Sequence, residues 1–396
     1  MTIGATNTTQ GSSTTRRLRL GMVGGGPGAF IGAVHRIAAR LDDHYELVAA
    51  ALSSDPEKSR SAARDLQISP DRAYGSYTEM ARSESARQDR IDAVSIVTPN
   101  NLHHPMAKAF LDAGIHVICD KPLTTTVDEA LDLAERVRRT KLIFGVTHNY
   151  TGYPMVRQAR QMVAEGQLGK IRVVQVHYAQ DWLATPLETT GQKQAVWRTD
   201  PAQSGPGGSL GDIGTHAYNL VCFVTSLKCQ QVAADVTTFV PGRRLDDNVH
   251  ILLRFDGDAR GMLWASQVAT GNANHLRLRV YGEKAGLEWF QEEPNYLRFA
   301  RLGQPPELIR RLGAGGSSPE AAHASRIPAG HPEGYLEAFA QLYTDLAEQI
   351  RAHDAERKPS PQSLLVPNVE DGVDGMRFIA ATLESSRRNA QWTDLR

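Results

Sequence analysis

The first 150 residues alternate short apolar runs with amphipathic segments, and this alternation constrains the fold more than any other feature. The apolar runs are nearly continuous, as expected for strands that are covered on both faces. The expected strands cover residues 19–23, 45–52, 93–97, 115–119 and 142–146. Helical patterns such as 106–113 and 127–138 lie between them. We therefore expect an α/β domain with a doubly wound, mostly parallel sheet.

The first expected strand runs into a glycine-rich turn over residues 24–32, which precedes a helical pattern. Glycines here let the backbone approach a pyrophosphate, whose charge is stabilised by amides at the start of the next helix. Ala29 completes a G-x-G-x-x-A motif, whereas Gly32 takes the third place if the loop is longer, and both registers remain open. At this turn we expect a dinucleotide to contact Gly24, Gly26, Ala29, Phe30 and Ile31.

The end of the second expected strand bears on the choice between NAD and NADP. An acidic residue about 20 positions beyond the glycines binds the ribose 2′-hydroxyl of NAD and repels the 2′-phosphate of NADP. If Ser53 holds this position, then Ser53 and Ser54, together with Lys58 or Arg60, are able to accept the phosphate. If Asp55 reaches back instead, NAD is favoured, so the sequence leaves both cofactors open.

Polar side chains follow the three remaining strands. They are Thr98, Asn100 and His103 after the third strand, Asp120 and Lys121 after the fourth, and Asn149 and Tyr150 after the fifth. Because the carboxyl ends of parallel strands form the ligand crevice, we expect all of them to face the cofactor. Pro122 fixes the chain just after Lys121, which favours a functional lysine over a solvated one. A structural role is the more usual one for a histidine such as His103.

After about residue 150 the strands follow one another without helices between the later ones. These expected strands cover 171–178, 231–240, 249–255, 261–268, 276–281, 286–290 and 296–301. Residues 302–334 are rich in Gly, Pro and Ser and are expected to form a long loop, and 335–353 and 373–385 return to helical periodicity. The pattern predicts a disordered tail (1–16), a dinucleotide-binding domain (17–147), an α+β substrate domain with a large open, mostly antiparallel sheet (148–330), and C-terminal helices that pack back on the core (331–396).

The densest polar motif of the second domain runs from Trp197 to His216. Asp212 and His216 are four residues apart, so in a helix they share one face and the carboxylate supports and orients the imidazole. This arrangement suits proton transfer, although an N-cap and a satisfied histidine would show the same spacing. Arg198 is either a substrate contact or the partner of a nearby aspartate.

The composition excludes several classes of protein. A chain of 396 residues is longer than one hydrophobic core usually organises, so we expect more than one domain. The numbers of basic and acidic residues are equal (44 each), so no net charge attracts nucleic acid. No run of about 18 apolar residues predicts a membrane span. The three cysteines have neither metal-ligand nor redox spacing, so we expect no metal site and a reducing compartment.

Arg16-Arg17 faintly matches a twin-arginine export signal, but cleavage there would remove the first strand, so we expect a cytoplasmic protein.

In its motifs and their order, the chain resembles the Gfo/Idh/MocA oxidoreductases over about residues 18–390. The shared motifs are the glycine turn, Thr98-Pro99-Asn100 with His103, Asp120-Lys121-Pro122, and Gly207-Gly208 followed by Asp212, Gly214 and His216. The resemblance implies that Lys121 is the catalytic lysine, that Asp212 and His216 complete the proton-transfer group, and that Asn100 contacts the nicotinamide ribose. Asp120 replaces the usual Glu of the family, and Asn219 stands where members often have an acid.

From the motifs and the resemblance together we expect an NAD(P)-dependent dehydrogenase. Its substrate would be a secondary hydroxyl of a cyclic polyol, meaning a sugar, a glycoside (for example at C3) or an inositol. Either Lys121 or His216 could take the proton first. The expected substrate contacts are Lys121, Asn149, Tyr150, Asp181, Arg198, Asp212, His216 and His331.

Two other functions share this architecture. An NAD-dependent glycosidase would oxidise its substrate transiently, eliminate a leaving group and return the hydride. A non-catalytic NAD(P)-binding regulator is disfavoured because Lys121, Asp212 and His216 are all present. The open sheet of the second domain also needs a cover, so we expect a homodimer or homotetramer.

Overall fold

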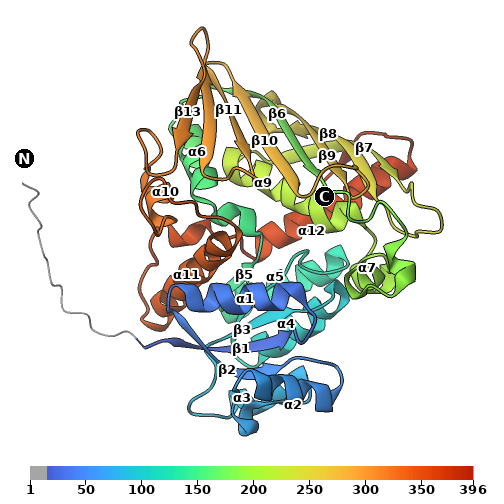
Figure 1. The fold of residues 1–396 in the computed structure, drawn as a ribbon, viewed down its shortest axis with the longest axis vertical. Coiled ribbons are helices and arrows are strands. Elements are labelled where there is room, and N and C mark those ends of the chain that lie inside the picture. Colours follow the sequence, from blue (N-terminus) through green and yellow to red (C-terminus); the bar gives the residue numbers. More distant parts are fainter. Residues whose placement is uncertain (1–15, 396) are drawn as a thin grey trace, which may run out of the picture.

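The computed structural model describes residues 16–395. The expected disordered tail therefore lies, except for Arg16, outside the described residues. Two sheets organise the described chain, with the larger one at the top of the view in Figure 1, the smaller one in its lower part, and several helices between them. No helix within residues 16–395 has both the length and the apolar character needed to cross a bilayer.

The N-terminal sheet is parallel and has the strand order β2-β1-β3-β4-β5. Its strands are β1 (Leu18–Gly24), β2 (Tyr45–Ala51), β3 (Ala93–Val97), β4 (His116–Cys119) and β5 (Phe144–Val146). Its helices are α1 (Phe30–Leu41), α2 (Pro56–Asp65), α3 (Tyr77–Ser85), α4 (His103–Asp112) and α5 (Val127–Thr140). Every residue of β3 is buried, which explains its uninterrupted apolar run. The order of the strands reverses between β1 and β3, and ligands of such folds bind outside the carboxyl ends at this point.

The second sheet has nine strands within the described chain, in the order β13-β12-β11-β10-β6-β9-β8-β7-β14. They are β6 (Ile171–Ala179), β7 (Cys229–Thr237), β8 (Asn248–Phe255), β9 (Arg260–Ser266), β10 (His275–Gly282), β11 (Ala285–Phe290), β12 (Tyr296–Arg301), β13 (Glu307–Arg310) and β14 (Thr393–Asp394). The β6–β9 pair is parallel, and its neighbours β6–β10 and β8–β9 are antiparallel. Val176 of β6 lies opposite both Leu263 of β9 and Leu278 of β10, so these buried side chains share one face.

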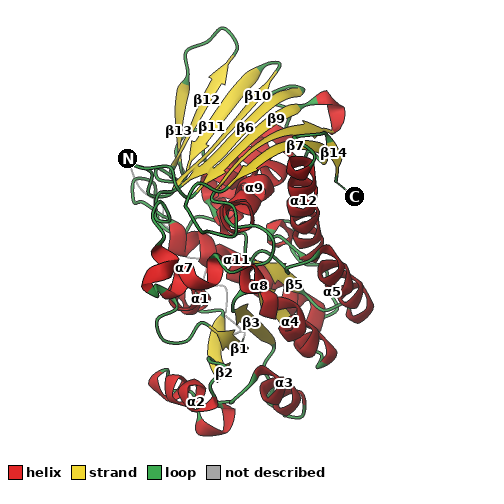
Figure 2. Cartoon of the chain, turned by 90° about the vertical axis from the view of Figure 1, so that its right-hand side faces the viewer, coloured by secondary structure: helices red, strands yellow, loops and turns green. Residues whose placement is uncertain are grey.

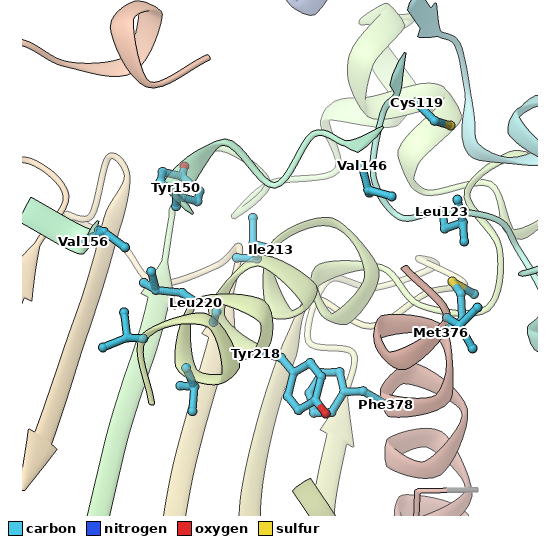
Figure 3. Packing of buried hydrophobic residues seen from close by; sticks show 14 of the residues in the cluster. Cys119, Leu123, Val146, Tyr150, Val156, Ile213, Tyr218, Leu220, Met376 and Phe378 are labelled. Atoms are coloured by element: carbon cyan, nitrogen blue, oxygen red, sulfur yellow. The ribbon is translucent and has the colours of Figure 1, made fainter. Parts of the chain in front are cut away.

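Helices cover one face of this sheet. They are α6 (Pro154–Ala164), α9 (Thr215–Thr225) and α12 (Val369–Arg387), and Figure 2 shows α9 and α12 beneath the sheet with its other face open. Tyr218 of α9 stacks on Phe378 of α12 at 4.1 Å between ring centroids. The same core continues through Met376 to Leu123 and Val146 of the N-terminal domain (Figure 3). The open face carries half-exposed apolar side chains.

Helix α11 (Tyr335–Asp354) returns to the N-terminal sheet and packs beside α1. Its Tyr343 hydroxyl lies 2.8 Å from His35 Nδ1 and 3.0 Å from the Ser95 hydroxyl, in a fully buried cluster. Leu346 of the same helix covers Gly145, where an added Cβ would lie 2.6 Å from a leucine methyl. The last part of the chain therefore completes the first domain.

The main differences from the predicted elements lie in residues 302–334. This segment is not a plain loop, because it contains β13 and a short helix, α10 (Pro319–His323). The buried ion pair between Arg311 and Glu333 (2.7 Å) joins the residue after β13 to the end of the segment. The remaining expected strands are present with shifted ends: β5 begins at Phe144, and β7 ends at Thr237.

Candidate active site

A large cavity of about 1110 Å³ lies between the two domains. One end is formed by the turns that follow β1, β2 and β3. The other end is formed by residues after β4, β5 and β6, by the start of α9, and by the start of α11. The cavity therefore joins the ligand crevice of the first sheet to the helical side of the second domain.

The glycine turn lies at the first end of the cavity. Gly24 has φ of +76°, and a Cβ there would lie 2.3 Å from the Val97 carbonyl oxygen. A Cβ at Gly32 would lie 2.3 Å from the carbonyl oxygen of Gly25, so Gly32 provides the close helix packing, and the longer register is the correct one. Ala29 is the N-cap residue of α1, and its side chain cannot cap the amides of the first turn. These open amides suit an anionic group.

All five residues predicted for this turn line the cavity: Gly24, Gly26, Ala29, Phe30 and Ile31. Ser53 and Ser54 after β2 also line it, as predicted. The carboxylate of Asp55 is used differently, because Oδ1 accepts hydrogen bonds from the amides of Glu57 (3.0 Å) and Lys58 (3.2 Å) and so caps α2. The side chain of Lys58 is 79% exposed and, unlike Ser53 and Ser54, does not line the cavity.

Lys121 is held by Asp212 at the centre of the cavity. Its Nζ donates to the backbone oxygen of Asp212 (2.5 Å) and to Oδ1 of the same residue (3.0 Å). The other carboxylate oxygen accepts from Gln267 Nε2 (2.8 Å) and lies 3.5 Å from Arg198 Nε. Burial acts to raise the pKa of Asp212, but the Lys121 and Arg198 cations outweigh it and hold this pKa well below its usual range. Asp212 is therefore an anion that fixes two cations.

His216 is not paired with Asp212, which contradicts the predicted orientation of the imidazole by this carboxylate. The reason is local: residues Leu210–Gly214 form a π-helix, in which four residues no longer complete a turn. Nδ1 of His216 is buried without a hydrogen-bond partner in the described chain. Burial, followed by the nearby charge of Lys121, lowers the pKa of His216 well below its ordinary value. The imidazole is therefore neutral near pH 7 and faces the cavity.

Several other predicted residues line the cavity: Thr98, Asn100, Asp120, Asn149, Tyr150 and Arg198. Asn100 Nδ2 donates to the carbonyl oxygen of Ser204 (2.8 Å), which ties the first domain to the second. Asp120 Oδ1 accepts from the Thr147 hydroxyl (2.7 Å). Asn149 Nδ2 is buried with no hydrogen-bond partner in the described residues. A buried amide of this kind needs a ligand or solvent oxygen.

Three further predicted contact residues do not line the cavity. His103 is fully buried outside the cavity, and its ring nitrogens lie 2.9 Å from the Pro122 oxygen and 3.0 Å from the Thr98 oxygen, so it joins two loops. Asp181 accepts from the Gly271 amide (2.9 Å), because its neighbours Gln180 and Trp182 point into the cavity instead. His331 is exposed and lies outside the cavity.

Several further residues of the cavity wall were not among the predicted site residues. They are Tyr178, Gln180, Trp182, Trp197, Asn274, Gln291, Tyr335 and Phe339. The Tyr150 and Tyr178 hydroxyls are 2.5 Å apart, and Tyr178 and Gln180 both donate to Asn274 Oδ1, at 2.6 and 2.8 Å. Polar residues that follow the predicted strand 171–178 were the available signal, since they occupy the same kind of position as Thr98 and Lys121.

A histidine and aspartate cluster outside the cavity consists of His116, His353 and Asp354. Nδ1 of His116 accepts a hydrogen bond from the Ile143 amide (2.9 Å), so the neutral ring carries its proton on Nε2. Nε2 faces Asp354 at 3.7 Å and has no lone pair to offer a metal ion. Burial lowers the pKa of His116 to about 4, which keeps the ring neutral.

Comparisons with known proteins agree with this geometry. Residues 18–148 match the family model "Oxidoreductase family, NAD-binding Rossmann fold", and residues 156–288 match "GFO/IDH/MocA C-terminal domain". An uncharacterized oxidoreductase of Bacillus subtilis is 34% identical over 385 residues, which cover 96% of this chain and 98% of that protein.

Two solved structures are also similar over 96% of this chain. An oxidoreductase from Sinorhizobium meliloti is 53% identical, with a TM-score of 0.87 and 99% of its chain covered. An inositol dehydrogenase homologue from Azotobacter vinelandii, complexed with NADH and myo-inositol, is 36% identical, with a TM-score of 0.87 and 98% of its chain covered. The chain belongs to the Gfo/Idh/MocA family and is an NAD(P)-dependent oxidoreductase.

Proposed function

We propose that the protein oxidises a secondary hydroxyl of a cyclic polyol, with His216 as the base and Lys121 as the hydrogen-bond donor to the reacting oxygen. The observation that carries the proposal is that Lys121 and His216 line the same cavity but differ in charge and in how they are held. Lys121 is held by Asp212 through two hydrogen bonds, whereas His216 is neutral and faces the same cavity. A fixed cation beside a neutral imidazole provides the donor and the acceptor that an alcohol oxidation needs.

The glycine turn fits the pyrophosphate of NAD or NADP, because Cβ atoms at Gly24 and Gly26 would fill the space beside Val97 and Leu52, and the α1 amides are open. When bound, the nicotinamide would accept the hydride from the substrate carbon. The chain's own task is to manage the proton. Neutral His216 accepts it from the hydroxyl.

The third N–H of Lys121 is left for the substrate oxygen, since Asp212 accepts the other two. This N–H stabilises the negative charge that develops on oxygen as the proton leaves. Asp212 does not exchange the proton in this scheme. Its strongly acidic carboxyl stays ionised and keeps both Lys121 and Arg198 in place.

Polar groups around this centre support a substrate with several hydroxyls. The Asn149 amide, unpartnered within the described chain, and the hydroxyl and amide network of Tyr150, Tyr178 and Asn274 lie on the walls of the same cavity. A site built to hydrogen-bond hydroxyls rejects analogues that lack them, because its buried polar groups would then be left unpaired. The myo-inositol bound by the Azotobacter vinelandii homologue is a substrate of this class.

The open sheet face supports a homodimer or homotetramer. Leu252 of β8 and Met262 of β9 lie opposite each other on this face and are 53% and 47% exposed. Val173 and Tyr281 extend the same apolar surface. A second copy would cover it, and light scattering at micromolar concentration should then give a multiple of 43.4 kDa. A mass of one chain would reject this assembly.

The experiment that tests the activity is an absorbance screen at 340 nm. Purified protein is mixed with NAD or NADP and with inositols, aldoses or glycosides, and Lys121→Ala serves as the control. We expect NADH or NADPH to accumulate with at least one cyclic polyol and not with the variant. Release of free sugar from a glycoside without net reduction of the cofactor would favour a glycosidase instead. Cofactor binding without turnover of any polyol would favour a regulator.

A further inference from the structure

The tryptophan shelf, defined as the side chains of Trp182, Arg198 and Trp197, forms part of the cavity wall, and the proposed reaction gives no role to its two indoles. Trp182 follows β6, and the other two residues belong to α7 (Lys193–Arg198). The guanidinium of Arg198 lies 4.3 Å from the Trp197 ring centroid and 6.0 Å from that of Trp182. Figure 2 shows α7 at the level between the two sheets.

Internal hydrogen bonds satisfy both indoles. Trp182 Nε1 donates to Gln180 Oε1 (3.0 Å), and Trp197 Nε1 donates to Gln194 Oε1 (3.3 Å). The rings therefore offer a ligand their edges and the apolar faces that Arg198 leaves uncovered, rather than hydrogen bonds. Two half-buried indoles that line one cavity are a large apolar surface, and such surface is typical of a binding site.

Arg198 connects the shelf to the reacting centre. Its Nη1 donates to Gln194 Oε1 (2.6 Å) and its Nε lies 3.5 Å from Asp212 Oδ2. Nη2 has no hydrogen-bond partner among residues 16–395 and remains available for a ligand oxygen. Lys121 and Arg198 approach different oxygens of the same carboxylate, so the shelf begins next to the position of the reacting ring.

We propose that the tryptophan shelf is a second subsite, which binds the substituent of a glycoside while the glycosyl ring reacts at Lys121 and His216. The inference rests on the proposed function and narrows its substrate class from cyclic polyols in general to glycosides with an apolar or cyclic aglycone. The indole faces pack against the aglycone, and Arg198 Nη2 donates to an oxygen close to the glycosidic bond. A free inositol or monosaccharide leaves the shelf uncovered.

The test compares matched substrates. The initial rate of cofactor reduction is measured for pyranoses and for the phenyl β-glycoside of each, with wild-type protein and with Trp197→Ala, Trp197→Phe and Trp182→Ala. We expect wild-type kcat/KM to be about 10-fold higher for the phenyl glycoside than for the free sugar. Trp197→Ala and Trp182→Ala should remove most of this preference, because they lower kcat/KM for the phenyl glycoside more than for the free sugar, and Trp197→Phe should retain most of it.

Trp392→Ala is the matched control, because Trp392 packs under Arg254 outside the cavity and should leave the preference unchanged. Equal kcat/KM for free sugar and glycoside would overturn the subsite alone. The subsite would also be overturned if Trp197→Ala lowered kcat/KM equally for the free sugar and for the glycoside. The same holds if Trp197→Ala raised the KM for NAD(P) and left the KM for the glycoside unchanged. Absence of oxidation of every sugar, glycoside and inositol would reject the proposed function and the subsite with it.

Discussion

The two ends of the cavity offer a ligand different kinds of group. The end at the glycine turn offers backbone at glycine positions, the open amides of α1 and the small hydroxyls of Ser53 and Ser54. The other end offers long side chains such as Lys121 and His216, which come from separate segments, and Lys121 is fixed there by Asp212. Binding through backbone at glycine positions should be lost when a substitution adds a side chain there. Chemistry that depends on long side chains should be lost when a substitution removes one of them. Substitutions at the two ends should therefore alter different kinetic constants.

The largest expected effect is at His216. Replacement by Ala should lower kcat by about 10²- to 10⁴-fold, because the alcohol then has no base, while the Kd of the cofactor stays unchanged.

Because burial lowers the pKa of His216, the wild-type kcat/KM should stay level as the pH falls to about 6.5, the ordinary pKa of histidine, and decline only below it, where the imidazole becomes protonated. A pH profile of both proteins with the same substrate checks this. A wild-type decline that begins above about pH 7 would contradict the neutral base.

Lys121 should show the next largest effect. Lys121→Ala removes the donor to the developing alkoxide and is expected to lower kcat by about 10²- to 10³-fold. Since Lys121 is fixed by Asp212 and not by the glycine turn, the fluorescence titration of cofactor should be unaffected. An unchanged kcat would remove Lys121 from the mechanism, and a loss confined to cofactor affinity would move it to the other end of the cavity.

Gly24→Ala tests the backbone end. The added Cβ would lie 2.3 Å from the Val97 oxygen at a position with φ of +76°, so the turn has to open, and the Kd of the cofactor should rise by roughly 10- to 100-fold. Gly28→Ala is the matched control, because Gly28 has the same φ, but a Cβ added there would have no atom of the described chain within 4 Å. Equal effects of the two substitutions would show that backbone strain, rather than the close approach, limits binding.

The smallest expected effect concerns the choice of cofactor. Within the described residues, no carboxylate lines the cavity beside Ser53 and Ser54, because Asp55 caps α2. Ser53→Asp should therefore disfavour NADP relative to NAD by about 1 to 3 kcal/mol, measured as the ratio of kcat/KM for the two cofactors. Ser53→Asn is the neutral control of similar size. A ratio that does not change would mean that the 2′ position lies elsewhere.

The backbone end was predictable from sequence to a greater extent than the side-chain end. Glycines after a buried strand determine where a turn approaches a neighbour, so Gly24 and Gly26 were placed correctly, and only the choice between Ala29 and Gly32 needed coordinates. At the other end, the prediction was off by one residue, because Asp181 was expected to face the cavity and its neighbour Trp182 lines it instead. Which of two adjacent side chains after a strand faces a cavity depends on the local backbone, which the sequence pattern does not give. The π-helix at residues 210–214 also separates Asp212 from His216. A π-helix has more residues per turn than an α-helix, so two residues four positions apart do not share one face as they would in a regular α-helix.

The packing of α11 against the first domain has a consequence for synthesis. β5 ends at Val146 and α11 begins at Tyr335, so about 190 residues must be translated before Leu342, Tyr343 and Leu346 reach the sheet. At the usual rates of translation this delay is roughly 10 to 40 s. During that time the nascent first domain exposes the apolar surface that α11 later buries, around Leu20 and Ile118. The newly made first domain therefore exposes a surface open to aggregation or to chaperone binding until about the last sixth of the chain, which begins with α11 at Tyr335, leaves the ribosome.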